Sequence, residues 1–157
     1  MVSGKVVVQN DFDYLIDSDT FVGMMLPSDA LHTRVHAIYQ RIKSEQKRLV
    51  TTNWVIAETA TVLSSRNSQK TAIEFIRHIQ QTDITILTIT PEIEEATYQL
   101  FCDQTTKRTS MVDCSNVAAA KHYDIPNILS FDRFYARFGY LMPLNTDYSN
   151  NKRISRN

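Results

Sequence analysis

The hydrophobic positions of this chain alternate between short strand-length runs and longer stripes with the spacing of helices. The short runs are 14–16, 49–50, 84–89 and 128–131. Between them, apolar residues recur at every third or fourth position over 29–45, over 67–81 and from Pro91 onward, which is typical of amphipathic helices. Strands that alternate with helix-length patterns indicate a parallel sheet with helices on both faces. The pattern therefore predicts an α/β domain with a central parallel sheet of four to five short strands.

Cap and turn residues mark where some of the predicted helices begin and end. Ser110 and Asp113 form an S-x-x-D start signal, in which the serine caps the helix and the acid lies in its first turn. This helix is expected to run to Tyr123, because the segment 124–127 (DIPN) contains a proline that stops it. Thr90-Pro91 opens another helix with a cap residue and a proline in the first turn.

The end of the chain carries weaker signals. We expect a short helix over 134–138, ended by Gly139, and a last short strand over 140–142. The sequence shows no repeat and no domain break, so it predicts one domain over 1–145. The remaining residues, 146–157, are expected to form a flexible C-terminal tail.

The composition is typical of one globular domain. The chain has 157 residues, of which 43% are hydrophobic and 22% are charged, and its formal net charge is zero. The charges are unevenly placed, because the region from Lys107 onward holds eight Lys or Arg residues against four Asp. This locally basic region permits contact with phosphate groups.

The sequence also bears on where the protein acts. No apolar run approaches the ~20 residues that a membrane-spanning helix needs, and the first residues lack the apolar segment of a signal peptide. Cys102 and Cys114 are too few for a disulfide framework or a zinc site. Both lie in predicted helices, and we expect them to be buried thiols of a reducing compartment. We therefore expect a cytoplasmic protein with no membrane partner.

Four acidic residues occupy places that would converge in such a fold. Asp17 and Asp132 follow predicted strands, and open α/β sheets bind ligands at the carboxyl ends of their strands. Asp113 lies at a predicted helix start. Glu58 lies one turn after Trp54, in the middle of an apolar helix face where an unpaired carboxylate is costly. Each acid also has an ordinary explanation as a helix cap, a turn residue or a partly exposed side chain.

A cluster of these four carboxylates would call for a divalent cation. Carboxylates that are brought together repel each other unless they are protonated or share a positive ion. Oxygen ligands of this kind favour Mg²⁺ or Mn²⁺. One or two such ions serve phosphoryl transfer, because they activate a water molecule and stabilise the leaving oxygen.

From about Tyr14 to Met142 the chain resembles the PIN-domain nucleases. The motifs that carry this resemblance are Asp17-Ser18-Asp19 after a hydrophobic run, Ala57-Glu58-Thr59 in a helix, Asp113-Cys114-Ser115, and Leu129-Ser130-Phe131-Asp132-Arg133 followed by an aromatic residue and a glycine. The resemblance implies a PIN-like fold and a metal-dependent endoribonuclease that hydrolyses RNA phosphodiester bonds. A compact chain with one such domain looks like a VapC toxin, whose partner is a small antitoxin protein.

The resemblance also implies roles for the acids. Asp17, Asp113 and Asp132 would hold the cation directly, and Glu58 would bind it or orient a water molecule. The chain departs from the family after Asp132, where it reads Arg133-Phe134-Tyr135 and many relatives have a His followed by Phe.

Several neighbouring residues are candidates for supporting roles. Ser110 and Ser130 could orient the carboxylates, and a plain helix cap is an equal explanation of Ser110. Asp19 is either an outer member of the acid cluster or a helix cap. The residues that could contact RNA phosphates are Lys107, Arg108 and Arg133.

Three other interpretations remain open. Asp17-Ser18-Asp19-Thr20 is similar to the D-x-D motif of haloacid-dehalogenase-type phosphatases, although no clear later lysine and acid pair follows. The chain could instead be a PIN-like module that binds RNA or a protein without cleaving it. His32 and His36 can share a helix face as zinc ligands do, but the segment lacks the catalytic Glu of metalloproteases.

We also expect a homodimer. The family that the chain resembles commonly pairs. In addition, Leu31, Val35 and Phe75 belong to apolar stripes that look wider than one sheet face requires.

Overall fold

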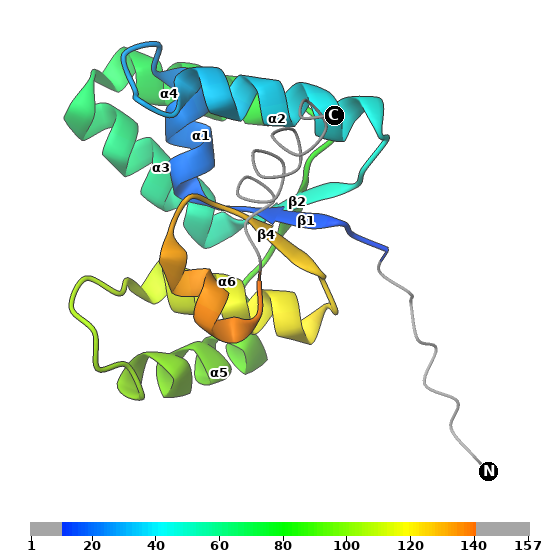
Figure 1. The fold of residues 1–157 in the computed structure, drawn as a ribbon. Helices are drawn as coiled ribbons and strands as arrows, with labels where there is room; N and C mark the ends of the chain where they lie inside the picture. Colours follow the sequence, from blue (N-terminus) through cyan, green and yellow to red (C-terminus); the bar gives the residue numbers. More distant parts are fainter. Residues whose placement is uncertain (1–10, 141–157) are drawn as a thin grey trace, which may run out of the picture.

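The computed structural model describes residues 11–140 of the chain, and its centre is a four-stranded parallel sheet (Figure 1). The strands are β1 (Tyr14–Ile16), β2 (Leu49–Thr52), β3 (Thr85–Leu87) and β4 (Asn127–Leu129). Their order across the sheet is β3-β2-β1-β4, and every pairing is parallel. The predicted α/β class with a parallel sheet of four to five strands is confirmed.

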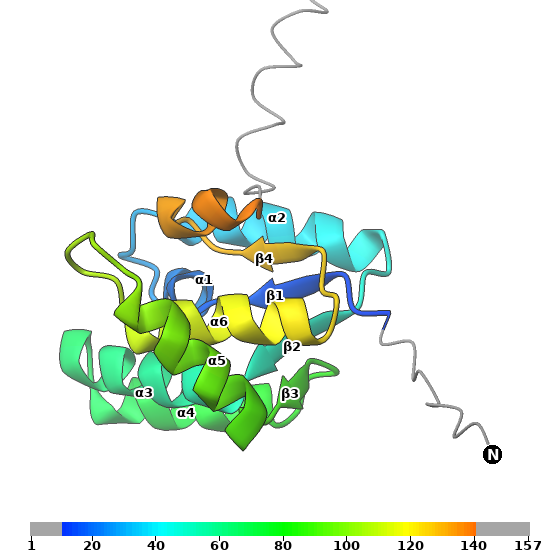
Figure 2. The ribbon, with the colours of Figure 1, turned by 90° about the horizontal axis from the view of Figure 1, so that it is seen from below.

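Helices cover both faces of the sheet (Figures 1 and 2). One face carries α1 (Ser18–Met25), α2 (His32–Ser44), α3 (Asn53–Arg66) and α4 (Gln69–Ile79). The other face carries α5 (Pro91–Cys102) and α6 (Met111–His122), and a short 3-10 helix, η1 (Arg133–Phe138), packs against α6. No helix within residues 11–140 is long and apolar enough to cross a lipid bilayer.

Neighbouring residues of one strand point to opposite faces of the sheet, and this alternation creates two apolar cores. Leu15 of β1 packs with residues of α5 and α6 such as Ile93 and Val117. The next residue, Ile16, packs with helices α1 to α4, where it meets Phe21 and Leu63. Because β1 is buried between both cores, Asp17, which directly follows this strand, has a fixed position at the edge of the sheet.

The expected start of the second helix and the expected burial of Cys102 are both wrong. The helix predicted from position 29 begins only at His32, because the carboxylate of Asp29 accepts a hydrogen bond from the backbone N–H of Leu31 (2.9 Å) and forms a turn. Cys102, which the helix pattern predicts to be buried, lies exposed at the end of α5. Cys114 is buried as expected, and burial raises the pKa of its thiol to about 11.

The short helix predicted over 134–138 is present as η1. It ends at Gly139, whose φ of 83° is a left-handed conformation that suits glycine. Tyr140 is not part of a strand, because its N–H donates to the carbonyl of Tyr135 (3.2 Å). Outside the described residues lie positions 141–142 of the predicted last strand and the predicted tail, 146–157. The division into a domain over 1–145 and that tail stays a prediction.

Candidate active site

Asp17 occupies the carboxyl end of β1, where it also caps the N-terminus of α1. Its side chain is 3% exposed and accepts four hydrogen bonds. One oxygen, Oδ1, accepts from the backbone N–H of Ser18 (2.7 Å) and from Nδ2 of Asn116 (2.9 Å). The other, Oδ2, accepts from the hydroxyls of Ser130 (3.0 Å) and Tyr135 (2.9 Å). Every donor is a neutral group, and no ion pair reaches this buried carboxylate from residues 11–140.

Asp113 begins α6 and faces the same place. The predicted S-x-x-D start signal is confirmed, because Ser110 Oγ accepts from the N–H of Asp113 (2.9 Å) and Asp113 Oδ2 accepts from the N–H of Ser110 (2.8 Å). The plain cap explanation of Ser110 therefore holds. The other oxygen of Asp113, Oδ1, lies 3.3 Å from the hydroxyl of Tyr135. That hydroxyl is thus a direct link between Asp17 and Asp113.

Glu58 reaches the site from α3. The fully buried line of this helix is formed by Val55, Thr59 and Leu63. Glu58 is half-buried at the edge of that line, and not in the middle of the apolar face as the sequence predicted. Its carboxylate accepts a hydrogen bond of 2.5 Å from the hydroxyl of Ser18, which lies directly after Asp17.

Ser130 connects two acids that are close in sequence. Its hydroxyl lies 3.0 Å from Oδ2 of Asp17 and 3.0 Å from Oδ2 of Asp19. Asp19 Oδ2 also accepts from the backbone N–H of Phe131 (2.7 Å). This bond takes the chain out of the sheet, so β4 ends at Leu129 and does not extend over 128–131 as predicted.

Asp132 lies on the exposed side of the site. It does not end β4 directly, but caps η1 by accepting from the N–H of Phe134 (2.8 Å). Its own N–H donates to Ser130 Oγ (3.0 Å). The side chain is exposed, and it lies near enough to Asp113 for the two charges to repel each other.

Burial and mutual repulsion dominate the electrostatics of the acid cluster. Burial raises the pKa of Asp17, Asp19, Glu58 and Asp113, because a charged carboxylate loses its hydration. Neighbouring acids raise the pKa further: Asp19 and Asp113 act on Asp17, Asp113 acts on Glu58, and Asp132 acts on Asp113. Between residues 11 and 140, no ion pair involves any of these five acids.

The donor chemistry of the cluster fits a hard divalent cation. Its ligand atoms would be carboxylate oxygens, which Mg²⁺ and Mn²⁺ prefer, and a cation would remove the repulsion between them. As the side chains stand, no three His, Cys, Asp or Glu residues of the described chain are grouped closely enough to hold a metal ion together. The oxygens of Asp17 and Asp113 are also held by hydrogen bonds from neighbouring donors.

A basic hollow of about 390 Å³ adjoins the acids. Its lining residues are Thr106, Lys107, Arg108, Thr109, Asp113, Asp132, Arg133, Phe134 and Arg137. The structure thus gathers the three basic residues singled out in the sequence beside two of the predicted site acids. Arg137 joins them, and its guanidinium lies 5.1 Å from the ring centroid of Phe134 and donates to Gln104 (2.8 Å).

Sequence reasoning missed Asn116, Tyr135 and Arg137. Asn116 had a visible signal, because it is an amide three residues after Asp113, at the start of the apolar segment Val117–Ala120. Tyr135 and Arg137 had none, since both lie in a short 3-10 turn whose facing could not be deduced from periodicity.

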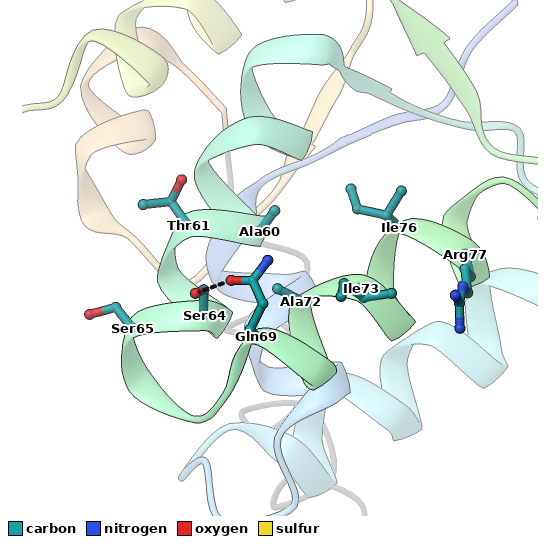
Figure 3. Close-up of a pocket in the computed structure, with 9 residues that line it drawn as sticks. All are labelled: Ala60, Thr61, Ser64, Ser65, Gln69, Ala72, Ile73, Ile76 and Arg77. Atoms are coloured by element: carbon teal, nitrogen blue, oxygen red, sulfur yellow. Dashed lines mark hydrogen bonds between the residues drawn. The ribbon is translucent and has the colours of Figure 1, made fainter.

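A second and larger hollow, of about 600 Å³, lies between α3 and α4 (Figure 3). It is lined mainly by small and apolar side chains such as Ala60, Ala72 and Ile76, and its one charged lining residue is Arg77. A hydrogen bond of 2.7 Å from Ser64 to Gln69 crosses one end. Among residues 11–140 no carboxylate lines this hollow, so the site acids do not act there.

The two histidines considered as zinc ligands have another role. His32 Nδ1 lies 2.8 Å from the carbonyl oxygen of Gly23, and His36 Nε2 lies 3.2 Å from that of Met24. These carbonyls belong to the last turn of α1, whose orphan acceptors need partners. No third ligand joins the pair within the described residues.

Comparison with known proteins places this arrangement in context. The sequence model of the PIN domain matches residues 14–139. Among solved structures, the fold is similar to that of VapC20 from Mycobacterium tuberculosis, described as a sarcin–ricin loop cleaving toxin. The TM-score is 0.72 and the identity 20%, over 82% of this chain and 97% of that one. A comparison with curated proteins gave no match.

Proposed function

The chain belongs to the PIN-domain family of nucleases, and we propose that it is a metal-dependent endoribonuclease that hydrolyses RNA phosphodiester bonds. One observation carries this proposal: a cluster of acids that form no ion pair within residues 11–140 lies at the carboxyl edge of a parallel sheet, directly beside a basic hollow. Acids that bind metal and cations that bind phosphate are the two parts that such a reaction needs.

The acids would hold Mg²⁺ or Mn²⁺, as one or two ions. Asp17, Asp113 and Asp132 are the proposed direct ligands, and Glu58 would bind the ion or orient a water molecule. When bound, the ion would activate the attacking water and stabilise the leaving oxygen. The Ser130 hydroxyl would help to orient Asp17 through a hydrogen bond. Asp19, which lies within hydrogen-bond distance of the same hydroxyl, would be an outer member of the cluster.

The basic hollow is the proposed contact surface for RNA. Lys107, Arg108, Arg133 and Arg137 line it next to Asp113 and Asp132. Positive side chains at this place would hold the phosphates that flank the cleaved bond, and such contacts position a strand without reading its sequence. Arg137 is the best fixed of the four, because Gln104 and the ring of Phe134 both hold its guanidinium.

The alternatives receive less support. In a D-x-D phosphatase a later lysine and a pair of acids would have to serve the reaction, and no clear set of this kind follows the motif. A binding module without catalysis would gain nothing from a group of buried acids that raise one another's pKa.

The test is cleavage of a labelled single-stranded RNA by the purified protein in Mn²⁺, in Mg²⁺ and in EDTA. We expect internal cleavage with either metal and none in EDTA. Cleavage that persists in EDTA would contradict the metal mechanism. RNA binding without cleavage would support the non-catalytic module, and hydrolysis of a small phosphate monoester alone would support the phosphatase.

We also propose that the protein is the toxin of a toxin–antitoxin pair and acts in the cytoplasm. The support is the fold shared with VapC20, itself described as a sarcin–ricin loop cleaving toxin. A small antitoxin protein would be the partner. Co-expression with the protein encoded beside it should abolish RNA cleavage and should yield a complex that survives gel filtration.

A homodimer remains a proposal, on a different basis from the one the sequence offered. Val35 is 2% exposed and Phe75 is 1% exposed, so both lie in the core of one molecule and leave no surface for another. The large apolar side chains that the described surface does expose are Ile73, Ile86, Tyr98 and Phe101. Light scattering at tens of micromolar should show a dimer if one of these regions pairs, and a monomer would contradict the proposal.

A further inference from the structure

A closed ring of hydrogen bonds surrounds the carboxylate of Asp17. The side-chain nitrogen of Asn116 donates one proton to Asp17 Oδ1 (2.9 Å) and the other to the hydroxyl oxygen of Tyr135 (3.0 Å). The Tyr135 hydroxyl in turn donates to Asp17 Oδ2 (2.9 Å). Three residues, at the end of β1 and in α6 and η1, thus form a cycle that engages both oxygens of one carboxylate.

This ring fixes the plane of the Asp17 carboxylate. A rotation about the bond that carries the carboxylate would break the hydrogen bonds to Asn116 and Tyr135 together. All three side chains are almost completely buried, so water does not replace a broken hydrogen bond at low cost. The ring therefore restrains the orientation of Asp17 more tightly than a single hydrogen bond would.

Packing alone does not explain these two residues. Asn116 is fully buried, and its Oδ1 has no hydrogen-bond partner in the described part of the chain. A buried acceptor without a partner is unfavourable, so an apolar residue would fill the same space better. What the amide provides, and an apolar side chain would lack, is the pair of donors on Nδ2.

The tyrosine extends the ring to a second acid. Its hydroxyl carries one proton, which the shorter distance assigns to Asp17 (2.9 Å), while Asp113 Oδ1 lies 3.3 Å from the same oxygen. The hydroxyl can turn its proton from one acid to the other without moving its ring. The Tyr135 hydroxyl oxygen therefore lies between Asp17 and Asp113 and can serve either of them.

We propose that Asn116 and Tyr135 are positioning residues, which orient Asp17 and Asp113 toward a shared divalent cation. This inference rests on the proposed metal-dependent function and adds two residues to its machinery. Hydrogen bonds to metal-binding carboxylates fix the orientation of the carboxylate, and their removal weakens metal binding even though every ligand is still present.

The test measures Mn²⁺ affinity directly, from the free-ion signal in electron paramagnetic resonance. Tyr135→Phe removes the hydroxyl and keeps the aromatic ring, and Asn116→Leu removes both donors at similar volume. We expect each to weaken Mn²⁺ binding about tenfold, with a cooperative melting transition retained in EDTA. Tyr140→Phe is the matched control, because Tyr140 is also a buried tyrosine but lies near Asp124, past the far end of α6. This variant should bind Mn²⁺ like the wild-type protein.

The double variant tests whether the two residues act as one unit. Either substitution alone opens the ring. The double variant, Tyr135→Phe with Asn116→Leu, should therefore have about the same Mn²⁺ affinity as the single variant that binds less tightly. If the losses of binding free energy in the two single variants add up in the double variant, the two residues do not act as one unit. If Asn116→Leu does not fold, Asn116→Ser replaces it, since the smaller side chain cannot clash in the same space.

The outcomes separate this inference from the proposed function. Wild-type Mn²⁺ affinity in Tyr135→Phe, beside measurable binding by the wild-type protein, would overturn the positioning role alone. A drop in melting temperature without a change in affinity would have the same meaning, because it would show that the hydroxyl serves stability only. No Mn²⁺ binding by the wild-type protein would overturn the metal-dependent function and this inference together.

Discussion

Ser18 donates a hydrogen bond of 2.5 Å to the carboxylate of Glu58, and this bond joins the first turn of α1 to the middle of α3. The two residues are far apart in the sequence, yet the bond holds Glu58 beside Ser18, which directly follows Asp17. Glu58 is thus directed into the site by a neutral donor, and it forms no ion pair within the described residues.

Glu58→Gln tests what that charge does. The amide oxygen of Gln can still accept from Ser18, so we expect the melting temperature in EDTA to stay the same or to rise slightly. RNA cleavage in Mn²⁺ should fall by about 100-fold or more, which corresponds to roughly 3 kcal/mol of transition-state stabilisation. Glu74→Gln, on the exposed face of α4, is the control and should cleave normally. Full activity in Glu58→Gln would remove this residue from the site.

Asp113→Asn tests the proposed ligand at the start of α6. Asn can accept the hydrogen bond from the N–H of Ser110 that the capping box requires, so the fold should remain intact. Cleavage should fall by factors of hundreds to thousands, because the ion loses a charged ligand. Melting in EDTA beside cleavage in Mn²⁺ separates the two effects.

The control for this variant is Asp124→Asn, at the other end of α6. Asp124 has a φ of 52°, a conformation that Asn also tolerates, so the substitution should affect neither folding nor cleavage. Normal cleavage by a folded Asp113→Asn protein would exclude Asp113 as a required ligand.

The stability of the metal-free protein should depend on pH in a defined direction. The pKa values of Asp17, Asp19, Glu58 and Asp113 are raised in the folded state, so the folded chain binds protons more tightly than the unfolded chain. Their contribution to stability is then fully present below the unfolded pKa values and is lost as pH rises through the folded ones. The melting temperature in EDTA should therefore rise as pH falls from about 8 to about 5.

Other carboxyl groups do not reverse this trend. The pKa values of Asp13 and Asp29 are lowered from the ordinary value of 3.8, so their contributions change only at lower pH. Saturating Mn²⁺ should flatten the trend, because the cation competes with protons for the same oxygens. A melting temperature in EDTA that falls toward pH 5 would show that the buried acids are not destabilised by their charge.

The basic residues of the hollow should contribute to the binding of single-stranded RNA. Arg133→Gln and Arg137→Gln should each weaken the binding of single-stranded RNA, and the slope of log affinity against log salt should shrink by about 0.7 for each phosphate that is no longer neutralised. Binding is measured in EDTA by fluorescence anisotropy, so that cleavage does not interfere. Arg77→Gln is the control, because Arg77 lies in the separate hollow between α3 and α4. An unchanged salt slope in both variants of the basic hollow would contradict the proposed RNA surface.

The sequence predicted the fold well because its elements are determined locally. Apolar runs and cap residues identify strands and helices, and a parallel sheet places the ends of its strands at one edge. Asp17 could therefore be expected near the start of α6 from the order of the elements alone. The S-x-x-D signal at Ser110 needs only four residues, and the structure confirms it.

The details of the site could not be predicted in the same way, because they depend on interactions between distant segments. The end of β4 is set by Asp19, which takes the N–H of Phe131 out of the ladder. The position of Glu58 depends on Ser18 in another helix. Tyr135 lies in a 3-10 turn without a usable periodicity, so nothing local indicates which way its hydroxyl points.

The strand order has a consequence for how the protein is made. β1, near the beginning of the chain, pairs on one side with β4, near its end, and Asp17 is contacted by Ser130 and Tyr135 from the last described segment. A nascent chain on the ribosome cannot assemble this cluster until those residues have left the exit tunnel. A fragment that ends before Ser130 would lack two of the hydrogen-bond donors to Asp17, so the proposed RNA-cleaving centre becomes competent only after this segment has been synthesised.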